Sequence, residues 1–101
     1  MRSLLLLFLI SSVGSPSISP SQQNDLRELV LQDCGSCHGL KLTGGLGSAI
    51  TAEALQGKSA TMLIETILNG RNNTPMPAWK SQLTRAEVAW IVEQLQKGNI
   101  K

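Results

Sequence analysis

The sequence is poor in aromatic side chains and in histidine. Its 101 residues include no tyrosine, one phenylalanine, two tryptophans and one histidine. The single phenylalanine, Phe8, lies in an N-terminal segment that has the features of a signal peptide. About 80 residues then remain, with Trp79 and Trp90 as their only aromatic side chains, and a chain of that size builds a marginal core from protein alone. We therefore expect another group to fill the middle of the fold.

The chain also has little net charge, no strand pattern and only two cysteines. Nine lysines and arginines stand against seven aspartates and glutamates, and so weak a balance indicates neither nucleic-acid binding nor attraction to a membrane surface. No segment alternates apolar and polar residues, so no strand is predicted. The only two cysteines, Cys34 and Cys37, are three residues apart. A disulfide between them would close a very small loop and stabilise the fold little.

The N-terminus has the layout of a secretory signal peptide. Arg2 is followed by an apolar run over residues 4–10 and then by small residues and prolines up to Ser21. The run is too short to cross a bilayer, which takes about 20 residues. We predict a signal peptide over residues 1–19, with the cleavage point left open, and a single domain over residues 20–101. The mature protein is expected in the periplasm, without stable membrane insertion.

The first half of the domain is predicted to form a helix followed by loops. Asn24 is the expected N-cap of the first helix, whose apolar face leads directly to Cys34 and Cys37. Residues 42–47 include three glycines and are expected to form a loop. A short helical turn is expected over residues 51–56.

Two further helices are predicted from their capping residues. Ser59 can cap the first, and Gly70 stands where a C-terminal glycine belongs. Thr84 and Glu87 form a capping-box pattern for the second, which Gly98 ends. Each helix has an apolar stripe: Leu63, Ile64, Ile67 and Leu68 in the first, and Val88, Ile91, Val92 and Leu95 in the second.

The strongest chemical signal is the run Cys34-Gly35-Ser36-Cys37-His38. Two thiols at this spacing can form thioethers with the two vinyl groups of one haem, and the next residue then faces the iron. The run predicts one covalently attached haem c, held by Cys34 and Cys37, with His38 as one axial ligand of the iron.

Three other interpretations of the cysteines are weaker. A dithiol redox motif needs a strand and helix around it, and the sequence predicts no strand. A structural zinc site needs four ligands, and the chain has no Cys or His beyond Cys34, Cys37 and His38. A plain disulfide leaves both His38 and the missing core unexplained.

Methionine is the expected second iron ligand, because His38 is the only histidine and a second one from the same chain is excluded. Met62 adjoins an apolar helical stripe, where methionine usually fills the core. Met76 lies between two prolines in residues 74–77, a stiff loop that can hold a thioether against a metal. We predict Met76 as the ligand; the alternative is an exposed loop methionine. A backbone carbonyl of residues 47–50 is the expected partner of the other His38 ring nitrogen.

A His/Met iron predicts an electron-transfer protein rather than an enzyme. Such an iron has no open position for a substrate, and the neutral thioether favours the ferrous state. The expected partner is another redox protein, and the expected oligomeric state is a monomer. A labile sixth ligand would instead make the protein a haem sensor or a small-ligand-binding enzyme.

Taken together, the helix leading to the cysteine motif, the glycine loop, Met76-Pro77 and the closing helix resemble the class I cytochrome c family. The resemblance implies an all-α fold of about four short helices wrapped around a largely buried haem, with the first and last helices crossing. The family often has a glycine and aromatics at that crossing, where this chain has Leu26, Val30 and Gln94. Trp90 is expected to take over the contact.

A narrower resemblance is to the small NirC-type cytochromes associated with haem d1 nitrite reductases. It rests on three segments, residues 32–40, 44–47 and 74–79. It implies a periplasmic carrier that serves the nitrite reductase in denitrification or, alternatively, an electron-accepting factor in the maturation of haem d1.

Overall fold

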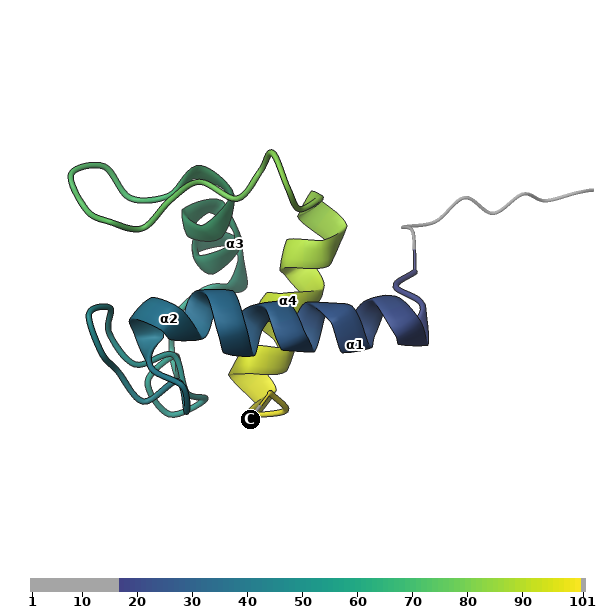
Figure 1. Cartoon of the computed structure of the whole chain (residues 1–101), viewed down its shortest axis with the longest axis horizontal. Coiled ribbons are helices and arrows are strands. Elements are labelled where there is room, and N and C mark those ends of the chain that lie inside the picture. Colours follow the sequence, from purple (N-terminus) through teal and green to yellow (C-terminus); the bar gives the residue numbers. More distant parts are fainter. Residues whose placement is uncertain (1–16, 101) are drawn as a thin grey trace, which may run out of the picture.

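The computed structural model describes residues 17–100, which form an all-α fold (Figure 1). The helices are α1 (Pro20–Leu29), the π-helix η1 (Val30–Cys34), α2 (Gly35–His38), α3 (Ala60–Asn69) and α4 (Arg85–Lys97). The described range contains no strand, as predicted. Most of the predicted signal peptide, residues 1–16, lies outside the described residues. None of the described helices is long and apolar enough to cross a membrane.

The first helix begins earlier than predicted. Ser19, not Asn24, is the N-cap: its hydroxyl accepts from the Gln22 backbone N–H at 3.2 Å, and the Gln22 side chain accepts from the Ser19 N–H at 3.1 Å. Pro20 follows at the first helical position, where its missing N–H costs nothing. The prediction of Asn24 was wrong because the Ser-Pro segment ahead of it, which we assigned to the signal region, holds a complete capping box.

Residues 20–38 form one continuous rod, because α1, η1 and α2 follow one another without a break (Figure 1). In η1 the Gly35 N–H donates to the Val30 carbonyl, five residues back. Such a π-turn fits one extra residue into the helix and changes the direction in which the following side chains point. The cysteine motif therefore begins where the helix widens, which the apolar periodicity alone did not predict.

The other helices have the predicted caps. Ser59 accepts from the Met62 N–H at 2.9 Å, and Gly70 ends α3 with a φ of 71°. The predicted Thr84 and Glu87 capping box is present in α4. Residues 52–57 form turns, and the Leu55 N–H donates to the Thr51 carbonyl at 3.0 Å, in agreement with the short helical turn predicted over residues 51–56.

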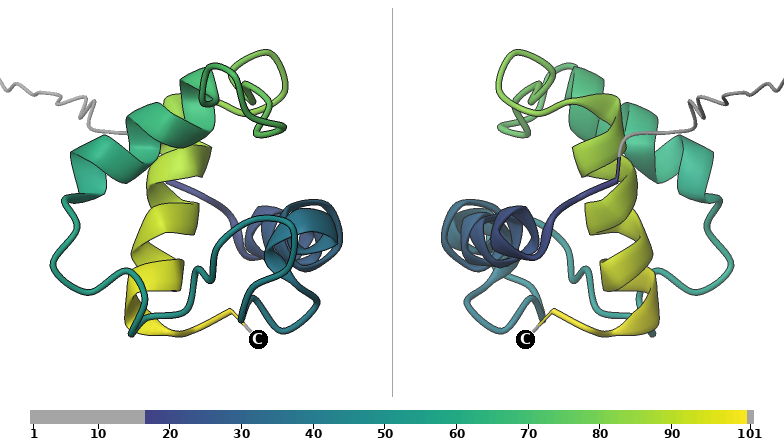
Figure 2. Two further views of the ribbon diagram at one scale, coloured as in Figure 1. Left: turned by 90° about the vertical axis from the view of Figure 1, so that its left-hand side faces the viewer. Right: turned by 90° about the vertical axis from the view of Figure 1, so that its right-hand side faces the viewer.

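The core lies where α3 and α1 pack against α4 (Figures 1 and 2). The crossing of first and last helices agrees with the predicted architecture. At this crossing the Arg27 guanidinium lies over the Trp90 ring, 5.2 Å from its centroid, so Trp90 does take part in the contact. The buried apolar residues are Leu26, Val30, Leu42, Leu55, Leu68, Leu83, Val88, Ile91, Val92, Leu95 and Ile100.

Removal of the α4 cap should lower the stability of the fold. Thr84→Ala leaves the Glu87 N–H without its hydroxyl acceptor, and we expect the free energy of unfolding to fall by about 1 kcal/mol. Thermal or guanidinium unfolding of the haem-loaded protein measures this change. Thr43→Ala, at an exposed threonine outside any helix, is the control and should have little effect. Equal unfolding midpoints for the two variants would contradict the role of the cap.

Candidate haem attachment site

The predicted cysteines and histidine share one stretch of helix. Cys34 ends η1, while Cys37 and His38 lie in α2, and all three side chains are half-buried. Both cysteines are free thiols. Among the described residues no group of three Cys, His, Asp or Glu side chains is placed to hold a metal ion. The structure therefore gives no support to the zinc alternative.

The Cys34 thiol lies in apolar surroundings. Burial, together with smaller contributions from the charge of Asp33 and from the neighbouring Cys37, raises the pKa of Cys34 to about 11. In the polypeptide without haem, Cys34 is therefore a protonated thiol near neutral pH. A thiol in this state is a poor nucleophile and is slow to oxidise.

One ring nitrogen of His38 is fixed by the backbone. Its Nδ1 lies 2.6 Å from the Ser48 carbonyl oxygen, which can accept the Nδ1 proton. The acceptor falls within residues 47–50, as predicted. This bond selects the tautomer that leaves Nε2 without a proton and free to bind a metal, and it also orients the ring.

Backbone from the glycine loop, residues 39–47, lies against the His38 ring. A Cβ on Gly47 would lie 2.9 Å from both Nδ1 and Cε1 of His38. The loop folds back onto the end of α2, where the N–H groups of Gly44 and Gly47 donate to the carbonyls of His38 and Cys37. The His38 imidazole is thus held by packing against Gly47 as well as by its hydrogen bond to the Ser48 carbonyl.

Two further glycines are needed for this fold-back. A Cβ on Gly39 would lie 2.6 Å from the Gly44 carbonyl oxygen, and one on Gly45 would lie 2.8 Å from the Cys37 carbonyl oxygen. Gly39 also has a φ of 98°, which side chains rarely allow. Sequence reasoning identified a loop here and a carbonyl partner for His38, but missed the close packing of Gly47 against the His38 ring. The density of glycine in residues 39–47 was the available signal.

Met76 lies in a separate segment between α3 and α4. Figures 1 and 2 show this segment at the same end of the molecule as α2. The Met76 side chain is half-buried, and its N–H donates to the Thr74 hydroxyl at 3.3 Å. Met62 is 46 % exposed, so the expectation that it fills the core was wrong.

Apolar side chains near this end are only partly covered. Leu63, Ile64 and Ile67 of α3, together with Trp79, pack against the core but stay half-exposed. An apolar helical stripe normally lies against another apolar group. The incomplete apolar wall, the two thiols, the oriented imidazole and the thioether are the donors and surroundings that a haem requires. The residues present therefore fit the predicted haem c.

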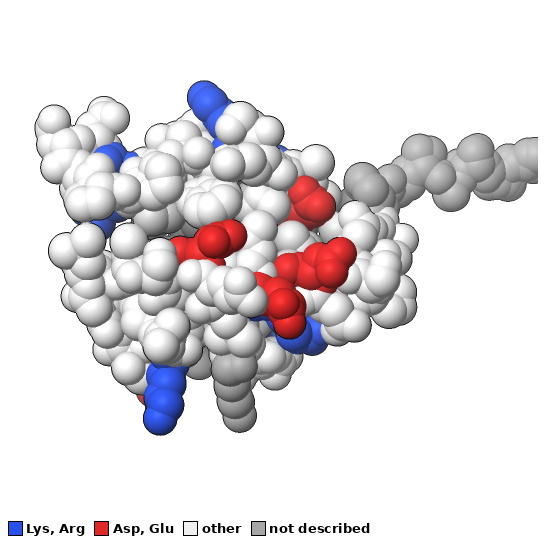
Figure 3. Space-filling view, viewed as in Figure 1, with Lys and Arg blue, Asp and Glu red and all other residues white. Residues whose placement is uncertain are grey.

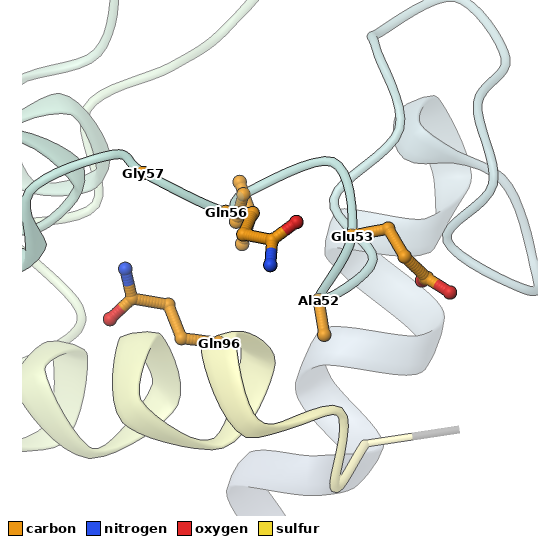
Figure 4. A pocket seen from close by; sticks show the side chains of 6 residues that line it. Ala52, Glu53, Gln56, Gly57 and Gln96 are labelled. Carbon is orange, nitrogen blue, oxygen red and sulfur yellow. The ribbon is translucent and has the colours of Figure 1, made fainter.

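A separate hollow of about 500 Å³ lies between residues 52–57 and the end of α4 (Figure 4). Its lining residues are Ala52, Glu53, Leu55, Gln56, Gly57 and Gln96. None of them is a Cys, His or Met, so this hollow is not the haem site.

Charged side chains are distributed unevenly over the face shown in Figure 3. Acidic side chains gather over the centre of this face, whereas the end with α2 and the methionine segment is largely uncharged apart from a few basic groups. On the glycine loop, Leu40 and Leu46 are 80 % and 78 % exposed. On this face, the end with α2 and the methionine segment is thus sparsely charged, and the exposed leucines make its surface partly apolar.

Comparison with known sequences identifies the family. Residues 21–94 match the family model described as cytochrome c oxidase, cbb3-type, subunit III. Cytochrome c55X of Pseudomonas aeruginosa is 54 % identical over 79 residues, a match that covers 78 % of this chain and 66 % of that protein. Cytochrome c55X of Paracoccus denitrificans is 46 % identical over 94 residues, covering 93 % of this chain and 91 % of the relative.

Comparison with solved structures agrees. The c-type cytochrome NirC superposes with a TM-score of 0.79 at 52 % identity, over 81 % of this chain and 96 % of NirC, which confirms both the predicted fold and the NirC-type resemblance. Part of the dihydro-haem d1 dehydrogenase NirN also matches, with a TM-score of 0.63 at 33 % identity, over 68 % of this chain and 15 % of NirN. The chain therefore belongs to the c-type cytochromes, and like the cytochromes c55X and NirC it is an electron-transfer protein with covalently attached haem c rather than an enzyme.

Proposed function

We propose that this cytochrome is a periplasmic single-electron carrier for haem d1 nitrite reductase in denitrification. Cys34 and Cys37 attach its haem, and His38 and Met76 are the axial ligands of the iron. The observation that supports the ligand set best is the 2.6 Å contact between His38 Nδ1 and the Ser48 carbonyl, because it leaves Nε2 free to bind the metal. When bound, haem iron with a His and a Met ligand gains and loses one electron at a time.

The link to nitrite reduction rests on the NirC-like fold. The match to NirC, at 52 % identity, extends over 81 % of this chain and 96 % of NirC. The predicted signal peptide, residues 1–19, supports export to the periplasm. After cleavage the protein is expected to be a monomer, without membrane insertion.

A second candidate function is to accept electrons during the maturation of haem d1. The observation that favours it is the match to a part of NirN, whose name describes a dihydro-haem d1 dehydrogenase. A dehydrogenation releases two electrons together with two protons. A cytochrome with one haem takes up one electron at a time, so two such molecules, or two successive encounters, would serve each reaction.

The Met76 assignment predicts a spectroscopic difference between the two methionines of the mature chain. Met76→Ala should abolish the sulfur-to-iron charge-transfer band of the oxidised protein, because the thioether that gives rise to it is gone. Met62→Ala is the matched control and should retain the band, since Met62 lies on α3, outside the methionine segment, with 46 % of its surface exposed.

The carrier and maturation functions require an iron whose sixth position is closed. The reduced wild-type protein should therefore not bind carbon monoxide rapidly at neutral pH, whereas reduced Met76→Ala should do so. Rapid binding by the wild type would favour a haem sensor or small-ligand-binding enzyme and would exclude both of the proposals above.

Gly47→Ala should raise the reduction potential. The added Cβ collides with the His38 ring, which weakens its bond to the Ser48 carbonyl, and a less basic imidazole stabilises the ferric state less. The expected change is on the order of one net hydrogen bond, about 1 kcal/mol. Gly35→Ala is the control, because a Cβ there meets its neighbours only at ordinary contact distances of 3.6 Å and 3.8 Å. Equal potentials for the two variants would contradict this role of Gly47.

A deletion strain distinguishes carrier from maturation factor. If this protein is a carrier, the nitrite reductase of the deletion strain should contain normal haem d1 but receive too few electrons in the cell. If it is a maturation factor, the reductase purified from that strain should contain incompletely processed haem d1. Extraction of the cofactor from the reductase and its absorption spectrum separate these results, and normal haem d1 with normal nitrite consumption would exclude both functions.

A further inference from the structure

The segment that contains Met76 passes very close to the end of α3. Gly70, the residue that ends this helix, has φ 71° and ψ −172°, a combination that is essentially restricted to glycine. A Cβ at this position would lie 2.7 Å from the Met76 carbonyl oxygen, 2.8 Å from the Pro77 carbonyl carbon and 2.9 Å from the Ala78 nitrogen. All three are backbone atoms, which cannot rotate away as a flexible side chain could.

Few other contacts hold this segment in place. The Arg71 N–H donates to the Met76 carbonyl at 3.3 Å, and the Thr74 hydroxyl donates to the Arg71 carbonyl at 2.8 Å. Both hydrogen bonds join residues of the loop itself, so they do not fix the position of the loop relative to α3. Backbone hydrogen bonds from this segment to α3 begin at Trp79 and Lys80, whose N–H groups donate to the carbonyls of Ile67 and Leu68.

We propose that Gly70 is a positioning residue for the axial ligand Met76. The absence of a side chain at residue 70 lets the backbone of residues 76–78 lie directly on the end of α3, and this contact sets where the Met76 thioether can reach. Any Cβ at residue 70 would collide with main-chain atoms of residues 76–78, so that backbone would have to move away from the end of α3. The inference rests on the proposed ligation by Met76 and adds to it the residue that makes that ligation possible.

The test is Gly70→Ala, and Gly57→Ala is its matched control. Gly57 also has a positive φ, 81°, but a Cβ there meets no atom within 4 Å. The control therefore introduces backbone strain of a related kind without a collision. Both variants are isolated with haem attached, and their haem content and helical circular dichroism are compared with those of the wild type.

Gly70→Ala should lose most of the sulfur-to-iron charge-transfer band, and its reduced form should bind carbon monoxide, while its helical content stays close to that of the wild type. Gly57→Ala should retain the band and should not bind carbon monoxide. In a Met76→Ala background, Gly70→Ala should change the reduction potential no further, since there is no thioether left to displace. A role in stability alone would lower the unfolding midpoint in both backgrounds and leave the band intact.

The results separate this inference from the proposed ligation. If Met76→Ala retains the band, the ligation itself is wrong, whatever Gly70 does. If Met76→Ala loses the band but Gly70→Ala retains it, only the positioning role is wrong. Should Gly70→Ala fail to load haem, haem loading is measured for Gly70→Ala in the Met76→Ala background, where a defect that acts only through the thioether should disappear. Failure of both to load haem would overturn the assignment, since Gly70 would then support the fold as a whole.

Discussion

The described chain has too few bulky apolar side chains to close its own centre, and much of the structure follows from that constraint. Its largest fully buried side chains are Ile91, Val30, Val88 and Val92, with no aromatic among them. The apolar stripe of α3 is half-exposed although Leu68 at its end is buried. A covalently attached haem supplies the missing apolar surface. The cofactor is therefore a part of the core, and its loss should affect the fold as well as the chemistry.

At both the His38 side and the Met76 side of the site, glycines let one backbone segment lie very close to another part of the protein. On one side Gly47 lies against the His38 ring, and Gly39 and Gly45 let the same loop fold back onto α2. On the other side Gly70 lies against the backbone of residues 76–78. Glycine suits these places because a polypeptide without a Cβ can pass another at shorter distance. Loops without regular structure can in this way hold metal ligands in place.

The sequence predicted best what depends on local chemistry. The caps at Ser59 and Thr84, and the glycine ends of α3 and α4, were predicted correctly because a hydroxyl or a left-handed glycine acts within one turn of chain. The start of α1 was predicted too late in the chain, because the signal-like composition around Ser19 led us to overlook its capping box with Gln22. The π-turn before Cys34 and the collisions at Gly47 and Gly70 were not predictable, since they depend on which segments meet in space rather than on neighbours in sequence.

The two proposed iron ligands differ in how firmly the protein holds them, and this difference bears on function. His38 is flanked by both thioether positions, bonded to the Ser48 carbonyl and enclosed by backbone hydrogen bonds from the glycine loop. Met76 lies in a segment whose neighbours over residues 71–75 are exposed and bonded mainly to one another. If one ligand dissociates, it should therefore be the methionine, which would open the sixth position of the iron. In the proposed arrangement, the close contact at Gly70 would oppose this opening, because it limits the positions available to the methionine segment.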